Sequence, residues 1–274
     1  MGDFVLLSGS AHPGLGASVA HVMKVRLGAC AIDDRSDRDP RVHLYEDVRN
    51  KDVFIIQPAP PPVNEYLVEL IALANAASRA RARRVIAVVP YFGYTRSDQG
   101  TAVTRILRSC GIDQVLTLDP HLMEETLARA VRRTIGSDCV VVSPHDKAQR
   151  LAQCLGEILA LPVVAIRGTH VIGDPADRPI LLADDVLATG TTMVRAVETL
   201  IGAGARLDFT LVATHGLLLH EARENLDLPL IRQIIVTDSV APQVIWPRLN
   251  IVTIAPLIAN AIDRTVRFRP LAAA

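Results

Sequence analysis

The 274-residue sequence is poor in aromatic residues, which make up 4% of it, and it has only four cysteines. Cys30, Cys110, Cys139 and Cys154 are scattered and form no CxxC pair, so neither a disulfide framework nor a zinc site is indicated. A net charge is also lacking, because 29 basic residues balance 29 acidic ones. This balance argues against a protein that attracts nucleic acid or an anionic membrane through its overall field.

Long apolar runs are missing as well, since none approaches the roughly 20 residues that a membrane span requires. The first residues, MGDFVLLSGSAHPG, lack a basic segment followed by a long apolar core, so they do not read as a signal peptide. We therefore expect a cytoplasmic protein with no nucleic-acid or membrane partner.

Aliphatic residues must build most of the hydrophobic core, because hydrophobic residues make up 50% of the sequence and aromatic residues only 4%. Short β-branched runs alternate with longer stretches whose apolar residues recur every three or four positions, which indicates strands alternating with helices. This alternation predicts an α/β fold with parallel sheets covered on both faces. The predicted strands are residues 52–57, 84–91, 114–120, 139–144, 162–166, 179–185, 208–216, 233–239 and 250–256.

A boundary between two domains is expected near residues 136–138, where a charged, helix-like stretch gives way to a new strand. We predict one domain over residues 1–137 and a second over residues 138–274. Each is expected to be a mostly parallel sheet flanked by helices.

The most informative stretch is ILLADDVLATGTTMVRAV, residues 180–197, in which a buried strand runs into two carboxylates and then a Thr/Gly loop. Backbone amides at the start of a helix can converge on a phosphate, and Gly190 permits close approach of the backbone. Asp184 and Asp185 would face ribose hydroxyls or a bound metal at the mouth of the strand, where ligands of open α/β sheets collect. The stretch therefore predicts a sugar-phosphate site.

This loop resembles the phosphoribosyl-diphosphate (PRPP) loop of type I phosphoribosyltransferases and PRPP synthetases. Other segments decide between them: PYFGYTRSDQ, residues 90–99, resembles the PYFGYARQDR segment of PRPP synthetases, and TLDPH, residues 117–121, resembles their TVDLH. The likeness covers nearly the whole chain in order, and ordinary phosphoribosyltransferases lack the N-terminal half. The sequence is therefore identified as a shortened, divergent member of the ribose-phosphate pyrophosphokinase (PRPP synthetase) family.

The resemblance implies two phosphoribosyltransferase-like domains, a homo-oligomer, and ATP held between neighbouring subunits. It implies transfer of the diphosphoryl group of ATP to ribose 5-phosphate with Mg²⁺, giving PRPP and AMP. The implied residues are Asp184, Asp185, Ala188, Thr189, Gly190, Thr191 and Thr192 for ribose 5-phosphate; Asp37, Asp39, Arg96 and Asp98 for ATP; His121 and Asp146 for metal; and His121 and Arg167 for catalysis.

Two departures from the family pattern concern the chemistry. The family's mobile catalytic loop, which begins DKRRP and supplies a lysine and an arginine, is replaced by the short connection RGTHVIGD, residues 167–174. Arg167 lies closest to the missing loop, and cations of this kind are worth about 10³–10⁵ in rate. In the family's SPDxGG segment, His145 occupies the position of the aspartate and Asp146 follows it. We expect binding to be retained and chemistry to be slowed.

Two other functions stay open at this point. One is a non-catalytic paralogue that assembles with or regulates a true synthetase. The other is a phosphoribosyltransferase that uses PRPP, because Ala188 stands where PRPP synthetases have a third acidic residue and the loop is closer to that of adenine phosphoribosyltransferases.

Overall fold

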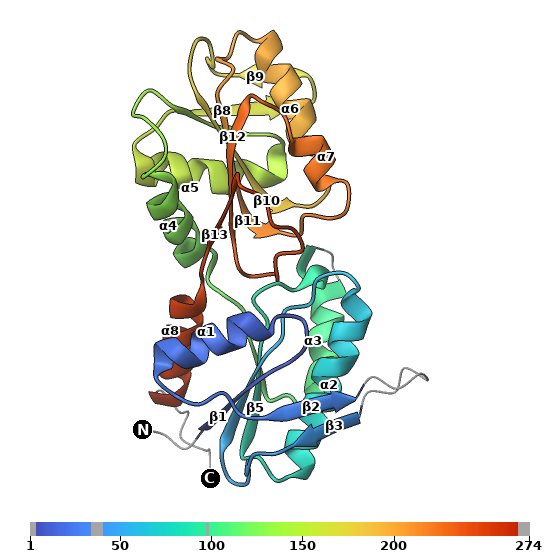
Figure 1. The fold of residues 1–274 in the computed structure, drawn as a ribbon. Helices are drawn as coiled ribbons and strands as arrows, with labels where there is room; N and C mark the ends of the chain where they lie inside the picture. The colour runs from blue at the N-terminus through green and yellow to red at the C-terminus, as the bar shows by residue number, and fades with distance from the viewer. Residues whose placement is uncertain (1–3, 34–40, 97–98, 268–274) are drawn as a thin grey trace. The chain divides into compact units, whose positions relative to one another are not determined.

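The computed structural model describes residues 4–33, 41–96 and 99–267. The chain divides into two compact units, the first made of residues 1–118 and 255–274 and the second of residues 119–254. Figure 1 shows that each unit is a twisted sheet with helices on both faces. The predicted α/β class with mostly parallel sheets is confirmed.

The first unit is built on a parallel sheet in the order β1-β4-β5-β6. Alternate strand residues such as Leu7, Val53 and Ile55 join the apolar face of α2 in one core cluster. Its elements are β1 (Phe4–Ser8), α1 (Pro13–Met23), β4 (Asp52–Ile56), α2 (Val63–Arg79), β5 (Arg84–Val88), the 3₁₀ turn η1 (Gly93–Arg96), α3 (Gln99–Ser109), β6 (Gln114–Leu116), α8 (Ala255–Arg267) and an antiparallel pair, β2 (Cys30–Asp33) and β3 (Arg41–Leu44).

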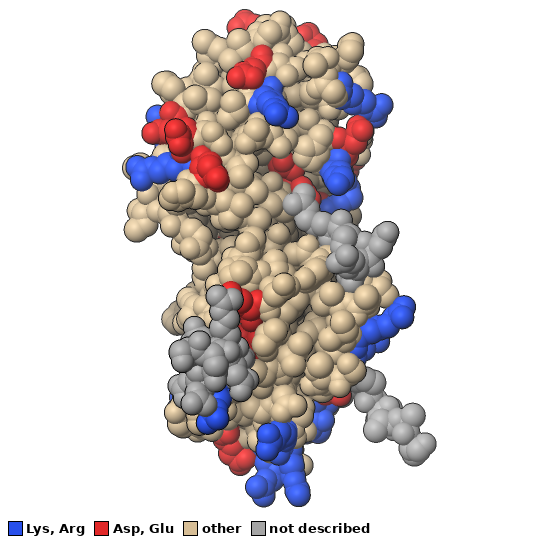
Figure 2. Space-filling view, turned by 90° about the vertical axis from the view of Figure 1, so that its right-hand side faces the viewer, with Lys and Arg blue, Asp and Glu red and all other residues tan. Residues whose placement is uncertain are grey.

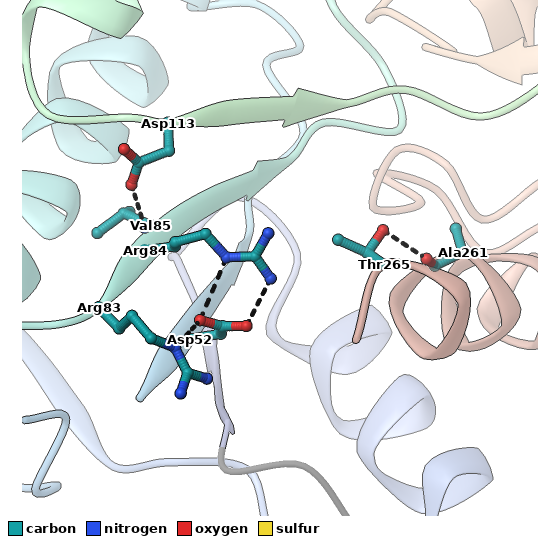
Figure 3. A network of polar contacts seen from close by, with 7 residues as sticks. All are labelled: Asp52, Arg83, Arg84, Val85, Asp113, Ala261 and Thr265. Carbon is teal, nitrogen blue, oxygen red and sulfur yellow. Dashed lines mark hydrogen bonds and ion pairs between the residues drawn. The ribbon is translucent and has the colours of Figure 1, made fainter. Parts of the chain in front are cut away.

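A buried ion pair lies at the start of the two central strands of this sheet (Figure 3). The Asp52 carboxylate is fully buried and accepts hydrogen bonds from Arg83 Nε at 2.7 Å and Arg84 Nη2 at 2.6 Å. Burial opposes ionisation of Asp52, but the hydrogen bonds from Arg84 and Arg83 outweigh it and lower the pKa of the carboxyl below its ordinary value. Beside it, Asp113 Oδ2 accepts the amide proton of Val85 at 2.7 Å.

The second unit is built on a larger sheet in the order β13-β12-β11-β10-β7-β8-β9, in which only β9 runs antiparallel to its neighbour. One face packs on α6 and α7, and the opposite face packs on α4 and α5. Its elements are α4 (Pro120–Val131), β7 (Val140–Ser143), the 3₁₀ turn η2 (Asp146–Ala148), α5 (Gln149–Leu159), β8 (Val163–Arg167), β9 (His170–Ile172), β10 (Ile180–Leu187), α6 (Thr191–Gly202), β11 (Phe209–Gly216), α7 (Ala222–Leu226), β12 (Ile231–Thr237) and β13 (Leu249–Val252).

The division of the chain differs from the predicted boundary at residues 137 and 138 in two places. Helix α4 belongs to the second unit, because Leu127, Ala128 and Val131 pack in the same core cluster as its strands. Helix α8 returns to the first unit, where it lies alongside α1. The sequence of an amphipathic helix predicts which of its faces is buried, but it does not predict against which sheet that face packs.

Figure 2 shows the charged side chains on one face of the molecule, with several basic ones together at its lower end. On the face drawn in Figure 2, acidic and basic side chains of the described residues lie in small groups separated by wide uncharged areas. Among the helices of the described ranges, none is long and apolar enough to cross a bilayer.

Candidate functional site

The sugar-phosphate stretch lies at the carboxyl end of β10, between β7 and β11. The strand runs two residues beyond the predicted end and stops at Leu187. Asp185 is half-buried, whereas Asp184 is only 3% exposed. Asp184 thus lies near the carboxyl end of the strand but is covered, whereas Asp185 is partly open to solvent.

Two polar contacts offset the cost of burying the Asp184 carboxylate. Its Oδ1 accepts the amide proton of Asp185 at 2.7 Å, and its Oδ2 lies 3.3 Å from His145 Nε2. His145 follows β7, and its Nδ1 accepts the amide proton of Ala148 at 3.3 Å. That bond places the ring proton on Nε2, facing the carboxylate. The histidine that stands where relatives have an aspartate is thus the partner of Asp184.

The loop after β10 is held from outside by the segment that follows β11. The carbonyl oxygens of Leu187 and Ala188 each accept a backbone amide from that segment at 3.0 Å. Asn225 Nδ2 donates to the Thr189 carbonyl at 2.8 Å. Because donors from elsewhere bind these carbonyls, the loop is held in place, and Ala188 and Thr189 within it are partly exposed.

Gly190 makes the turn from this loop into α6. Its φ of 82° is in the left-handed region, and an added Cβ would lie 2.7 Å from Leu226 Cγ. The first amides of a helix have no acceptor within it and carry the positive end of the dipole. Thr191 and Thr192 are exposed at this helix start, and the hydroxyls of Thr189 and Thr191 lie 3.0 Å apart. Amides and hydroxyls are therefore placed as a cradle for a phosphate.

Arg167 and Asp146 come to the same edge of the second sheet. Strand β8 is the parallel neighbour of β7, so the carboxyl ends of both lie beside that of β10. Arg167 Nε lies 3.3 Å from Asp146 Oδ1, and both side chains are largely exposed. Gly168 and Thr169 alone separate β8 from β9, so the connection is a tight hairpin and not a long loop. The structure therefore places Asp146 against a cation.

His121 is not part of the group formed by Arg167 and Asp146, and it lies at the start of α4. Asp119 caps the helix by accepting the His121 amide proton at 2.9 Å. The imidazole Nδ1 lies 3.5 Å from Glu124 Oε2 and 3.8 Å from Cys154 Sγ. Burial and the Glu124 carboxylate raise the pKa of Cys154 to about 12. The neighbours of His121 are thus a carboxylate and a thiol that sequence reasoning did not connect with it.

Most of the predicted ATP-binding residues lie outside the part of the chain that the structure describes. Asp37, Asp39 and Asp98 lie outside the described residues, and only the backbone of Arg96 is described, at the end of η1. A surface pocket of about 530 Å³ borders η1 and is lined by residues 62–65, Gly93 and Tyr94. The ATP assignments therefore stay predictions.

His145 and Asn225 support the site through their contacts with Asp184 and Thr189, and the sequence did not predict these roles. His145 had a signal, its position in SPHDK, but that position suggested a displaced aspartate and not a partner for Asp184. Asn225 had none, because its role depends on where α7 meets the loop.

Comparison with known proteins agrees with this geometry. Residues 4–117 match the model of the N-terminal domain of ribose phosphate pyrophosphokinase, and residues 137–270 match that of the phosphoribosyl synthetase-associated domain. A ribose-phosphate pyrophosphokinase of Buchnera aphidicola is 32% identical, with 96% of each chain covered. The chain belongs to the ribose-phosphate pyrophosphokinase family.

Further members of the family are similar over the same length. The ribose-phosphate pyrophosphokinase of Maricaulis maris is 32% identical to this pyrophosphokinase homologue. The matched residues cover 94% of this chain and 96% of the Maricaulis maris protein. The crystal structure of a phosphoribosylpyrophosphate synthetase from Mycobacterium smegmatis superposes with a TM-score of 0.88 at 28% identity, covering 97% of this chain and 99% of that one. The expected family and its phosphoribosyltransferase-like fold are therefore confirmed.

Proposed function

We propose that this pyrophosphokinase homologue transfers the diphosphoryl group of ATP to the C1 hydroxyl of ribose 5-phosphate, at a reduced rate. The C1 oxygen attacks the β-phosphorus and its hydroxyl proton is released to solvent, the bond from that phosphorus to the oxygen bridging the α-phosphorus breaks, and AMP leaves. The observation that carries the proposal is the supported cradle from Ala188 to Thr192 at the end of β10. We also propose that the active form is a homo-oligomer, as the family resemblance implies.

The cradle residues are assigned to binding and orientation. The first-turn amides of α6 and the hydroxyls of Thr191 and Thr192 hold the 5-phosphate, which fixes the sugar at one end. Asp185 is assigned to the ribose hydroxyls. Asp184 is buried, and its contact with His145 fixes the direction of its carboxylate.

The donor set at this edge fits Mg²⁺. Two carboxylates and the threonine hydroxyls are oxygen ligands, which Mg²⁺ prefers, and it commonly binds through one or two carboxylates together with phosphates of the substrate. Asp184 and Asp185 are the residues that would hold it, and bound Mg²⁺ would neutralise charge on the diphosphate. Asp146, the other proposed metal residue, forms an ion pair with Arg167. Mg²⁺ would have to compete with that arginine for the Asp146 carboxylate.

The decisive experiment measures AMP released from ATP and Mg²⁺ by the purified chain, with and without ribose 5-phosphate. We expect AMP release that requires ribose 5-phosphate, together with an equal amount of PRPP. AMP release at the same rate without the sugar would contradict the proposal.

The tight hairpin between β8 and β9 favours a second candidate, a non-catalytic paralogue. Without a long loop, this connection cannot close over the transferring group as a lid. Calorimetric binding of PRPP without turnover, combined with co-assembly with an active pyrophosphokinase, would support this candidate. Pyrophosphate release from PRPP only after a base is added would instead support a phosphoribosyltransferase.

Replacing Arg167 with alanine is expected to lower kcat about tenfold and to leave the affinity for ribose 5-phosphate unchanged. An arginine that clamps the transferring group is worth about 10³–10⁵, but Arg167 is exposed and paired with Asp146, so its effect is smaller. Arg206→Ala, which removes another surface arginine paired with aspartates, is the control and should keep full activity. Equal kcat in both variants would exclude Arg167 from the chemistry.

A further inference from the structure

A cluster of three metal-ligating side chains joins α4 to α5, apart from the sugar-phosphate cradle. His121 and Glu124 are three residues apart on α4, and Cys154 faces them from α5. One ligand atom of each residue lies within 4.8 Å of the other two. A nitrogen, an oxygen and a sulfur therefore converge on one small volume between two packed helices.

The separations match those of a tetrahedral metal centre. With metal bonds of about 2.0 Å to nitrogen, 2.1 Å to oxygen and 2.3 Å to sulfur, tetrahedral angles place nitrogen and oxygen about 3.4 Å apart and nitrogen and sulfur about 3.5 Å apart. The observed distances are 3.5 Å from His121 Nδ1 to Glu124 Oε2 and 3.8 Å from His121 Nδ1 to Cys154 Sγ. These two separations are within a few tenths of an ångström of the tetrahedral values, and the Glu124 oxygen and the Cys154 sulfur lie within 4.8 Å of each other.

The surroundings provide support on one side and access on the other. The Glu124 side chain is 2% exposed, and its second oxygen, Oε1, lies 2.6 Å from Arg150 Nη1. An ion pair between the non-ligating oxygen and a cation, here the largely exposed Arg150, is the kind of contact that helps to orient a carboxylate ligand. Cys154 is buried, whereas the His121 side chain is 77% exposed, so an ion can enter from the histidine side.

We propose that His121, Glu124 and Cys154 bind one Zn²⁺ ion per chain. A mixed nitrogen, oxygen and sulfur set suits Zn²⁺, while Mg²⁺ takes oxygen ligands. On binding, the sulfur–hydrogen bond of Cys154 breaks, a zinc–sulfur bond forms and the proton goes to solvent. Three protein ligands leave the fourth position for water. None of its residues belongs to the cradle, but His121 is also the histidine that the family resemblance implies for catalysis, so the test measures Zn²⁺ binding and not activity.

The role of such an ion would be to tie α4 to α5. Both helices cover the same face of the second sheet, and their apolar residues share one core cluster. The ligands come from positions about 30 residues apart in the chain, which is why the scattered cysteines gave no zinc spacing in the sequence. The prediction that His121 contacts a metal would thus hold for a different ion from the one that was expected.

The test uses the full chain without a histidine tag, stripped with a chelator and titrated with Zn²⁺ in competition with a chromophoric chelator. We expect one equivalent to bind, and Mg²⁺ in excess not to displace it. Co²⁺ in place of Zn²⁺ should show a thiolate-to-cobalt charge-transfer band. Cys154→Ala should abolish that band and weaken Zn²⁺ at least about 100-fold, since even partners of ligands are worth about 10–100-fold.

Two further variants keep the result independent of folding. His121→Ala changes an exposed side chain and should weaken Zn²⁺ as Cys154→Ala does, with an unchanged far-ultraviolet circular dichroism spectrum. Cys110→Ser removes a cysteine of the first unit and should bind like the wild type. Zinc bound equally by the wild type and His121→Ala, or a cobalt complex without the thiolate band, would overturn the proposal.

Discussion

Replacing Gly190 with valine is expected to weaken the binding of ribose 5-phosphate and PRPP about 100-fold while the second unit stays folded. Valine is β-branched and strongly disfavours a φ of 82°, and its Cβ would meet Leu226 at less than van der Waals distance. The turn must shift, and the α6 amides move with it. Hydrogen bonds to a charged group are worth about 1.5–3 kcal/mol each, so the loss of one or two bonds to the phosphate weakens binding about 10²-fold.

Glycine at the opposite end of the same helix provides the matched control. Gly202 is the last residue of α6, and an added Cβ there has no described atom within 4 Å. Gly202→Ala should therefore bind ribose 5-phosphate as the wild type does and unfold at the same or a slightly higher temperature. Isothermal titration with ribose 5-phosphate and with PRPP measures both variants. Wild-type affinity in Gly190→Val would show that the phosphate is held elsewhere.

The nine predicted strands are all present, and the reason is physical. Central strands of a parallel sheet are buried on both faces, so they appear as continuous β-branched runs such as β4 and β7, whose residues are almost all buried. Strand β1, a parallel strand at the edge of the first sheet, was not predicted, nor were β2, β3 and β9. The last three share one reason. They are short, antiparallel and partly exposed, so they lack such a run.

The cradle was also predictable, because β10, its loop and α6 are contiguous in sequence and each step follows from local residue preferences. The His145–Asp184 contact was not. It depends on β7 lying beside β10, and sheet order is set by packing rather than by chain order. The cluster of His121, Glu124 and Cys154 depends in the same way on α4 meeting α5.

Replacing Arg83 and Arg84 together with methionine is expected to lower the free energy of unfolding of the first unit by about 3–5 kcal/mol, the cost of leaving a buried charge without its partner. Asp52 is fully buried and would lose both guanidinium groups, whereas either single variant keeps one. Hydrogen exchange of the amides of β4 and β5 measures the loss where it occurs. Arg26→Met, which removes an exposed ion pair with Glu46, should cost about 0–1 kcal/mol.

The pH dependence of the double variant gives an independent check on the same ion pair. In the wild type, the lowered pKa of Asp52 means that its stabilisation is present above the unfolded pKa of about 3.9 and is lost as the pH falls through the folded pKa. Without the arginines, the groups that lower the pKa of Asp52 are gone while burial still raises it, so the folded pKa rises and protonation costs the folded state less. The stability difference between the two proteins should therefore narrow as the pH is lowered from 7 towards 4. A constant difference over this range would mean that Asp52 stays ionised through contacts other than those with Arg83 and Arg84.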